Sequence, residues 1–128
     1  MVEYKKFYQM DLWQEAFELQ KQIFEITKDF PNKEEYGLTS QFNRSANSVL
    51  ANLAEPHGRY HFLDKIRVLY IVRGEIEETQ SHIIVAKSRN YISREKQVEL
   101  VNKYEGVKMK VNKYINNLVQ QNKNNNKK

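Results

Sequence analysis

The chain has 128 residues, of which 40% are hydrophobic and 29% charged, with only 4 glycines and 2 prolines. This length fits one domain with one shared core, and the scarcity of turn-forming residues favours long helices. Because the chain has no cysteine, disulfides, thiolate zinc sites and a cysteine nucleophile are excluded.

The net charge of +5 is unevenly distributed along the chain. Residues 1–105 carry 15 Lys or Arg against 16 Asp or Glu, whereas residues 106–128 carry 6 against none. The positive excess therefore lies in the C-terminal stretch. No apolar run has the length of a signal peptide or a membrane span, so we expect a soluble, cytoplasmic protein.

The first predicted helix runs from Asp11, a candidate N-cap, to about Phe30, where Pro31 disfavours further helix. Its apolar residues recur every three or four positions, as in an amphipathic helix. A second apolar row widens this face beyond what one neighbouring helix would cover, so we expect it to form an interface between copies of the chain. This row consists of Trp13, Phe17 and Phe24.

A second helix is predicted to begin at Thr39 or Ser40 as N-cap and to end at residues 56–58, Pro-His-Gly. The third runs from about His61 to Ser88 and contains Gly74, which is either tolerated or marks a close crossing by another helix.

Ser93 is the predicted N-cap of a fourth helix, whose apolar residues keep helical spacing as far as Leu118. Four helices joined by short links pack against their sequential neighbours in opposite directions. The sequence therefore predicts an all-α fold, an antiparallel up-down-up-down four-helix bundle over residues 1–121. A flexible, polar and basic tail is expected over residues 122–128.

Patterns for catalysis and for metal or cofactor binding are weak. Glu78 and His82 are four residues apart, yet the chain has no Glu-x-x-His pair and no matching ligands on a second helix. It also lacks a glycine-rich phosphate loop and a Gly-x-Ser-x-Gly turn. The carboxylates of Glu75, Glu77 and Glu78 are expected to form a solvated face, with salt bridges to basic residues one turn away. We therefore expect no enzymatic activity, no metal and no cofactor.

Arg73 lies at the edge of the apolar stripe of the third helix, where a charge needs a partner or a route to water. Glu55 and Glu77 are the candidate partners. The pattern favours an ion pair between Arg73 and Glu55 that would hold the second and third helices together.

Six groups of residues resemble a known family in order and spacing. They are Leu12-Trp13-Gln14, Phe30-Pro31, Tyr36-Gly37-Leu38-Thr39-Ser40-Gln41, Asn52-Leu53-Ala54-Glu55 with Gly58-Arg59, Arg73-Gly74, and Glu78-Thr79-Gln80. The family is that of the 23S rRNA intervening-sequence proteins, also called the four-helix bundle protein family. The resemblance spans about Met10 to Leu118.

This resemblance implies a four-helix bundle that assembles into a homopentameric ring and is encoded in segments inserted into bacterial 23S rRNA genes. A distant relative, the accessory variability determinant of diversity-generating retroelements, is a basic pentameric bundle that works with a reverse transcriptase and binds nucleic acid. Association with RNA or DNA is the expectation that follows by analogy. The chain departs from the family at Leu50, where proline is frequent, and at Pro56, where glycine is usual. It also has Asn43-Arg44 where a pair of basic residues is frequent.

Nucleic-acid contacts are expected mainly at the basic C-terminal stretch, from Lys108, Lys110 and Lys113. Arg44 and Arg59, near turns of the second helix, are secondary candidates. Two alternatives stay open. The lysines could serve only to keep the terminus soluble, and the bundle could be a protein-interaction scaffold for a reverse transcriptase or a ribosome-associated partner.

Overall fold

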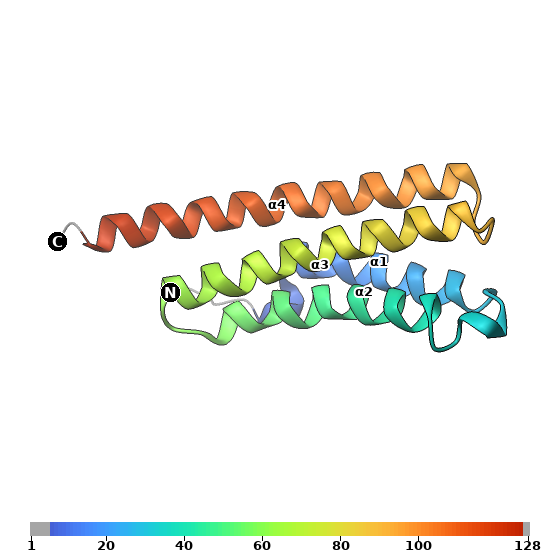
Figure 1. Ribbon diagram of the computed structural model, residues 1–128. Helices are drawn as coiled ribbons and strands as arrows, with labels where there is room; N and C mark the ends of the chain where they lie inside the picture. Colours follow the sequence, from blue (N-terminus) through green and yellow to red (C-terminus); the bar gives the residue numbers. More distant parts are fainter. Residues whose placement is uncertain (1–5, 127–128) are drawn as a thin grey trace.

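The protein is an all-helical bundle, seen in a computed structural model that describes residues 6–126 (Figure 1). The prediction of a four-helix bundle is confirmed, and no strand occurs among the described residues. The long helices are α1 (Asp11–Thr27), α2 (Leu38–Ala54), α3 (Phe62–Ser88) and α4 (Arg94–Asn126). Three short 3-10 helices accompany them: η1 (Phe7–Gln9), η2 (Asn32–Glu34) and η3 (Glu55–Gly58).

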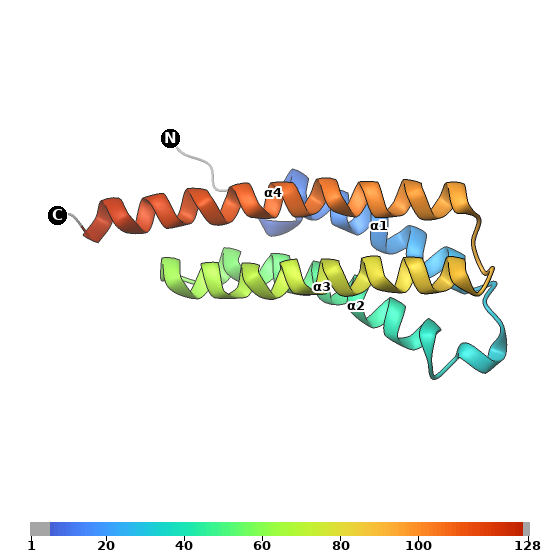
Figure 2. The same ribbon diagram turned by 45° about the horizontal axis from the view of Figure 1, so that its top comes forward.

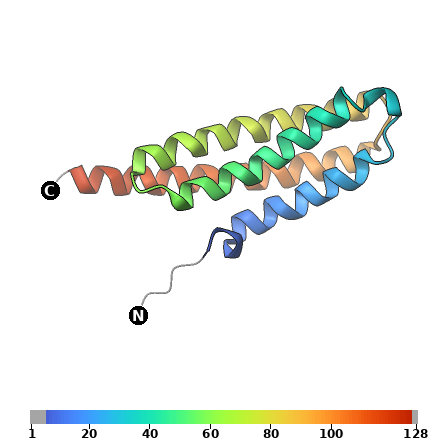
Figure 3. The same ribbon diagram turned by 90° about the horizontal axis from the view of Figure 1, so that it is seen from below.

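Sequential helices run in opposite directions (Figures 1 and 3). α3 packs extensively on both α2 and α4, whereas α1 packs more on α2 than on α4. The inner faces are filled by Leu, Ile, Val and Phe side chains, as the helical spacing of these residues predicts. Three cross-helix hydrogen bonds fix the register: Asn43 of α2 to Thr27 of α1 (2.9 Å), Thr79 of α3 to Ser45 of α2 (2.8 Å), and Arg73 of α3 to Asn112 of α4 (3.0 Å).

The helix ends differ from the predicted ones where distant residues take part. α2 begins at Leu38 with Gly37 as N-cap, in place of Thr39 or Ser40, and the Glu34 carboxylate accepts a hydrogen bond from the Leu38 amide (3.4 Å). α4 begins where the sequence predicts, because its cap is local: the Ser93 hydroxyl accepts a hydrogen bond from the Lys96 amide (3.1 Å).

Gly74 is exposed, and a Cβ at this position would meet no atom of the other helices within 4 Å. The glycine therefore marks no close crossing within the bundle. Of the two alternatives, the one in which Gly74 is only tolerated agrees with the structure of one copy.

α4 is longer than expected. The helix continues through Asn126, where the sequence led us to expect a tail from residue 122, and residues 127–128 lie outside the described part. Its last turns extend past the N-terminal end of α3 (Figures 1 and 2). Within residues 6–126, no helix combines the length and the apolar character needed to cross a membrane.

A carboxylate ties two connections together at one end of the bundle. Besides the Leu38 amide, Glu34 accepts hydrogen bonds from Arg89 (2.7 Å) and from the Tyr91 hydroxyl (2.8 Å). The hydrogen bond from Tyr91 is the largest cause that lowers the pKa of Glu34; burial acts in the opposite direction, and Arg89 adds to the lowering. The charged carboxylate therefore joins the α1–α2 connection to the α3–α4 connection.

Glu34→Gln should lower the melting temperature near neutral pH, and its difference from the natural protein should shrink in acid. The reason is that the pKa of Glu34 is lower in the folded chain, so its contribution is complete above the ordinary value of 4.5 and is lost as the pH falls through the folded value. Thermal unfolding at about pH 7 and about pH 3 measures this. Glu35→Gln, at the exposed neighbour, is the matched control and should behave like the natural protein at both values. An unchanged melting temperature for Glu34→Gln would contradict the role of this carboxylate.

Tyr104 is fully buried in α4, and its hydroxyl has no hydrogen-bond partner among the described residues. Burial raises the pKa of this phenol above its usual range. Tyr104→Phe should leave the free energy of unfolding unchanged or raise it by about 1 kcal/mol, because the hydroxyl is desolvated without compensation. Urea unfolding measures this, with Tyr104→Ala as a variant that should lose about 3–5 kcal/mol with the ring. A Phe variant destabilised by more than about 1 kcal/mol would show that the hydroxyl has a partner.

Candidate nucleic-acid interface

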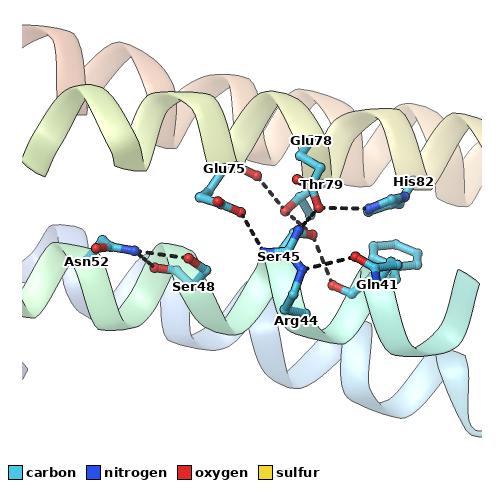
Figure 4. A network of polar contacts seen from close by, with 10 residues as sticks. Gln41, Arg44, Ser45, Ser48, Asn52, Glu75, Glu78, Thr79 and His82 are labelled. Atoms are coloured by element: carbon cyan, nitrogen blue, oxygen red, sulfur yellow. Dashed lines mark hydrogen bonds and ion pairs between the residues drawn. The ribbon is translucent and has the colours of Figure 1, made fainter. Parts of the chain in front are cut away.

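Arg44, one of the candidate cations, reaches from α2 to α3 and is compensated there (Figure 4). Its guanidinium forms ion pairs with Glu78 and with Glu75 (3.4 Å to the Glu75 oxygen), while its Nε donates to Gln41 (3.0 Å). Glu78 also contacts Nε2 of His82 (3.2 Å). Burial raises the pKa of Glu78, but the hydrogen bonds with His82 and Arg44 outweigh it, so the pKa is lowered. This network holds α2 on α3.

Two further polar contacts lie nearby, one between α2 and α3 and one within α2 (Figure 4). The hydroxyls of Ser45 and Thr79 are joined by a buried hydrogen bond, and the Asn52 amide donates to the Ser48 hydroxyl (3.0 Å). Gln41 and Glu78, from two of the groups that carry the family resemblance, thus belong to the Arg44 network, whereas the hydrogen bonds of Asn52 stay within α2.

Lys108 and Lys110 are also compensated by carboxylates from neighbouring helices. The Lys108 side chain is only 15% exposed, and its Nζ lies within ion-pair distance of Glu77 on α3 and of Glu105 on α4 (2.9 Å). Burial lowers the pKa of Lys108, but the two carboxylates outweigh it and raise the pKa. Lys110 pairs with Glu15 of α1. These two lysines therefore attach α4 to α3 and α1.

The acidic turn of α3 consists of Glu75, Glu77 and Glu78. Its Arg and Lys partners, Arg44 and Lys108, come from α2 and α4, so the expected salt bridges to Lys or Arg one turn away are replaced by ties between helices. Within α3, Glu78 contacts His82 one turn away.

Arg73 and Glu55 do not form the expected ion pair. Arg73 lies on the side of α3 that faces α4, where it donates to Asn112 and stacks over the ring of Tyr70, 4.9 Å from the ring centre. Glu55 pairs with Arg59 one turn further along the chain. The Glu55 carboxylate is the largest cause that raises the pKa of Arg59, so Arg59 is compensated as well.

Lys113 is the one candidate of the five that is exposed and has no ion pair among the described residues. It belongs to a larger group at the end of the bundle formed by the N-terminal half of α3 and the C-terminal half of α4. We call this group the basic end; it consists of Lys65, Arg67, Arg73, Lys113 and Lys123, none of which has a carboxylate partner in residues 6–126. Asp64 is the single acidic residue in the two helix halves, 62–74 and 112–126.

The opposite end of the bundle is different. Its basic residues Lys33, Lys87 and Arg94 also have no ion pair among the described residues, but Asp29, Glu35 and Glu95 balance their charge at this end, and Arg89 pairs with Glu34. Sequence reasoning missed Lys65 and Arg67 because residues 1–105 as a whole are nearly neutral. The local run Lys65-Ile66-Arg67 was visible, but only the fold shows that it lies beside the end of α4.

The residues expected at an interface between copies are partly covered by their own chain. Trp13 packs on Phe17 (5.0 Å between ring centres) and on Phe7 (5.6 Å), and both Trp13 and Phe17 contact the core. Phe24 is 51% exposed. Other large apolar side chains lie exposed on α3, at Leu63, Tyr70, Ile71 and Ile84.

A family model described as 23S rRNA-intervening sequence protein matches residues 8–113. The chain belongs to this family. The match covers α1, α2, α3 and the first half of α4, which confirms the resemblance carried by the six groups of residues.

One similar solved structure is a protein of unknown function from the S23 ribosomal protein family of Bacteroides thetaiotaomicron. It aligns with a TM-score of 0.75 and 23% sequence identity over 82% of this chain and 95% of that chain, a likeness that shows the fold. A search of curated proteins found no match. Within residues 6–126, no group of three or more His, Asp or Glu side chains could hold a metal ion.

Proposed function

We propose that this member of the 23S rRNA-intervening sequence family is a non-enzymatic, self-associating bundle that binds RNA through its basic end. The observation that carries the proposal is the distribution of charge compensation. Arg44, Arg59, Lys108 and Lys110 have carboxylate partners within the chain, so a phosphate would have to compete with these partners. The cations of the basic end have no such competitors among the described residues.

Phosphate neutralisation by these cations would release counterions from the nucleic acid, so affinity should be salt-dependent and weakly selective for sequence. Aromatic side chains accompany the basic end at Tyr60, Tyr70 and Tyr114, a combination typical of nucleic-acid-binding surfaces. In an assembly of several copies, the basic end would be repeated and the weak contacts would add up.

Lys113→Gln with Lys123→Gln should weaken RNA binding at low salt by about tenfold, and should reduce the slope of log affinity against log salt by about 0.7 to 0.9 per lost contact. The matched control is Lys33→Gln with Lys87→Gln, which removes the same charge from the opposite end and should change affinity less than about threefold. Fluorescence anisotropy with a labelled RNA, and with DNA of the same sequence, measures both.

Absence of RNA binding at low salt, or an equal loss in the two double variants, would contradict the proposal. Tighter binding of the DNA than of the RNA would show that the basic end prefers DNA, and would contradict the assignment to RNA.

A scaffold role is the second candidate, favoured by a continuous stripe on the solvent side of α3. The stripe recurs at alternating intervals of four and three residues, as in a helix that packs on a partner. It combines exposed apolar residues, small residues and two charged ones, and its members are Leu63, Arg67, Tyr70, Gly74, Glu77, Ser81 and Ile84.

A ring of more than two identical copies needs two different complementary surfaces on each copy. The α3 stripe and the α1 surface around Phe24 meet this requirement, because α1 and α3 occupy opposite corners of the bundle, each between α2 and α4. We therefore propose that the part of the α3 stripe from Gly74 to Ile84 packs on the α1 surface of the next copy, which leaves Arg67 and Tyr70 to the basic end, and that the family's pentameric ring results.

Light scattering at micromolar concentration should return about five times the 15.3 kDa of one chain. Phe24→Glu and Ile84→Glu should each prevent assembly, because each buries a charge in one of the two surfaces. An equimolar mixture of the two variants should form a dimer, since one intact surface of each kind remains. Met109→Glu, at an exposed residue of α4, is the control and should assemble normally.

A mass near 15.3 kDa for the natural chain would refute self-association. Full assembly of both single variants would refute these surfaces.

A further inference from the structure

A cavity of about 610 Å³ lies at the basic end, between the first turn of α3 and the last turns of α4. It exists because α4 continues past the N-terminal end of α3 (Figure 2). Its volume is within the range of small-ligand sites. The lining side chains that could contact a ligand are Tyr60, His61, Asp64, Asn122, Asn125 and Asn126.

The lining offers an aromatic ring and several amides. Tyr60 is 90% exposed, although its ring meets the His61 ring edge to face at 5.1 Å, so one neighbour orients it while its surface stays open. Each Asn amide provides both a donor and an acceptor, the combination that pairs with the edge of a nucleobase. Lys65 and Lys123 flank the cavity in sequence, beside residues that line it.

Charge decides how a nucleotide would be placed. Asp64 lines the cavity and would repel a phosphate there, but its carboxylate could accept a hydrogen bond from the amino group of a base. Phosphates would instead lie outside, near Lys65 and Lys123. A base inside a duplex is stacked and its edges are engaged, so the ligand must be unpaired.

We infer that this cavity binds an unpaired nucleobase of single-stranded RNA, stacked on Tyr60 and hydrogen-bonded by the Asn side chains of α4. The inference rests on the proposed RNA binding and names the form of RNA that the basic end recognises. The asparagines at the end of a helix are commonly regarded as solvated. Here α4 continues past the N-terminal end of α3, so three of its asparagines line the cavity: Asn122, Asn125 and Asn126.

Tyr60→Leu should weaken binding of a short single-stranded RNA at least about fivefold, the loss expected when one stacked base is released. Tyr60→Phe should keep most of the affinity, because the ring remains. Tyr36→Leu is the matched control, since Tyr36 is equally exposed, at 90%, at the opposite end of the bundle. The duplex of the same sequence should bind more weakly than the single strand and should be insensitive to Tyr60→Leu. Circular dichroism checks that every variant is folded.

Equal effects of Tyr60→Leu and Tyr36→Leu, or equal binding of duplex and single strand, would overturn the cavity inference. If the Lys113 and Lys123 double variant still loses affinity in that case, the proposed RNA binding stands without the cavity. If no RNA binds at low salt, both proposals fall. Single-stranded DNA of the same sequence identifies the source of the base: weaker binding supports RNA, and equal or tighter binding overturns the assignment to RNA.

Discussion

The acidic turn of α3 is the feature on which the arrangement of charge in this bundle depends. Its carboxylates receive Arg44 from α2 on one side and Lys108 from α4 on the other, so one helical turn pairs with both neighbours. Partly exposed ion pairs of this kind contribute little stability, yet they determine which cations have partners. Because Arg44, Lys108 and Lys110 are compensated and the cations of the basic end have no carboxylate partner among the described residues, the positive excess is left at the basic end.

The fold was predictable because its signals are local. Helical spacing of apolar residues and caps such as Ser93 involve residues a few positions apart, and the structure confirms them. The start of α2 was not predictable in this way, since Glu34 holds it together with Arg89 and Tyr91, more than fifty residues along the chain. The length of α4 was underestimated because polar Asn and Lys residues continue the helix without an apolar pattern to reveal it.

The candidate site was predictable only in part, for a similar reason. A count of charges finds the basic C-terminal stretch, but it does not show that Lys110 meets Glu15 at a separation of 95 residues, or that Lys108 is held between two helices. Of the five cations expected from the sequence, Lys113 is the one that belongs to the proposed interface. Lys65, Arg67 and the cavity beside Tyr60 depend on the pairing of α3 with the end of α4, which no stretch of sequence shows by itself.

The central claim is that RNA contacts the basic end and not the compensated cations of the bundle centre. Ultraviolet crosslinking of single-stranded RNA to the full chain, followed by mass spectrometry of the adducts, tests it directly. The account predicts adducts in residues 59–74 and 112–126, with Tyr60 among them. Adducts centred on Arg44, Lys108 or the α1–α2 connection would contradict it.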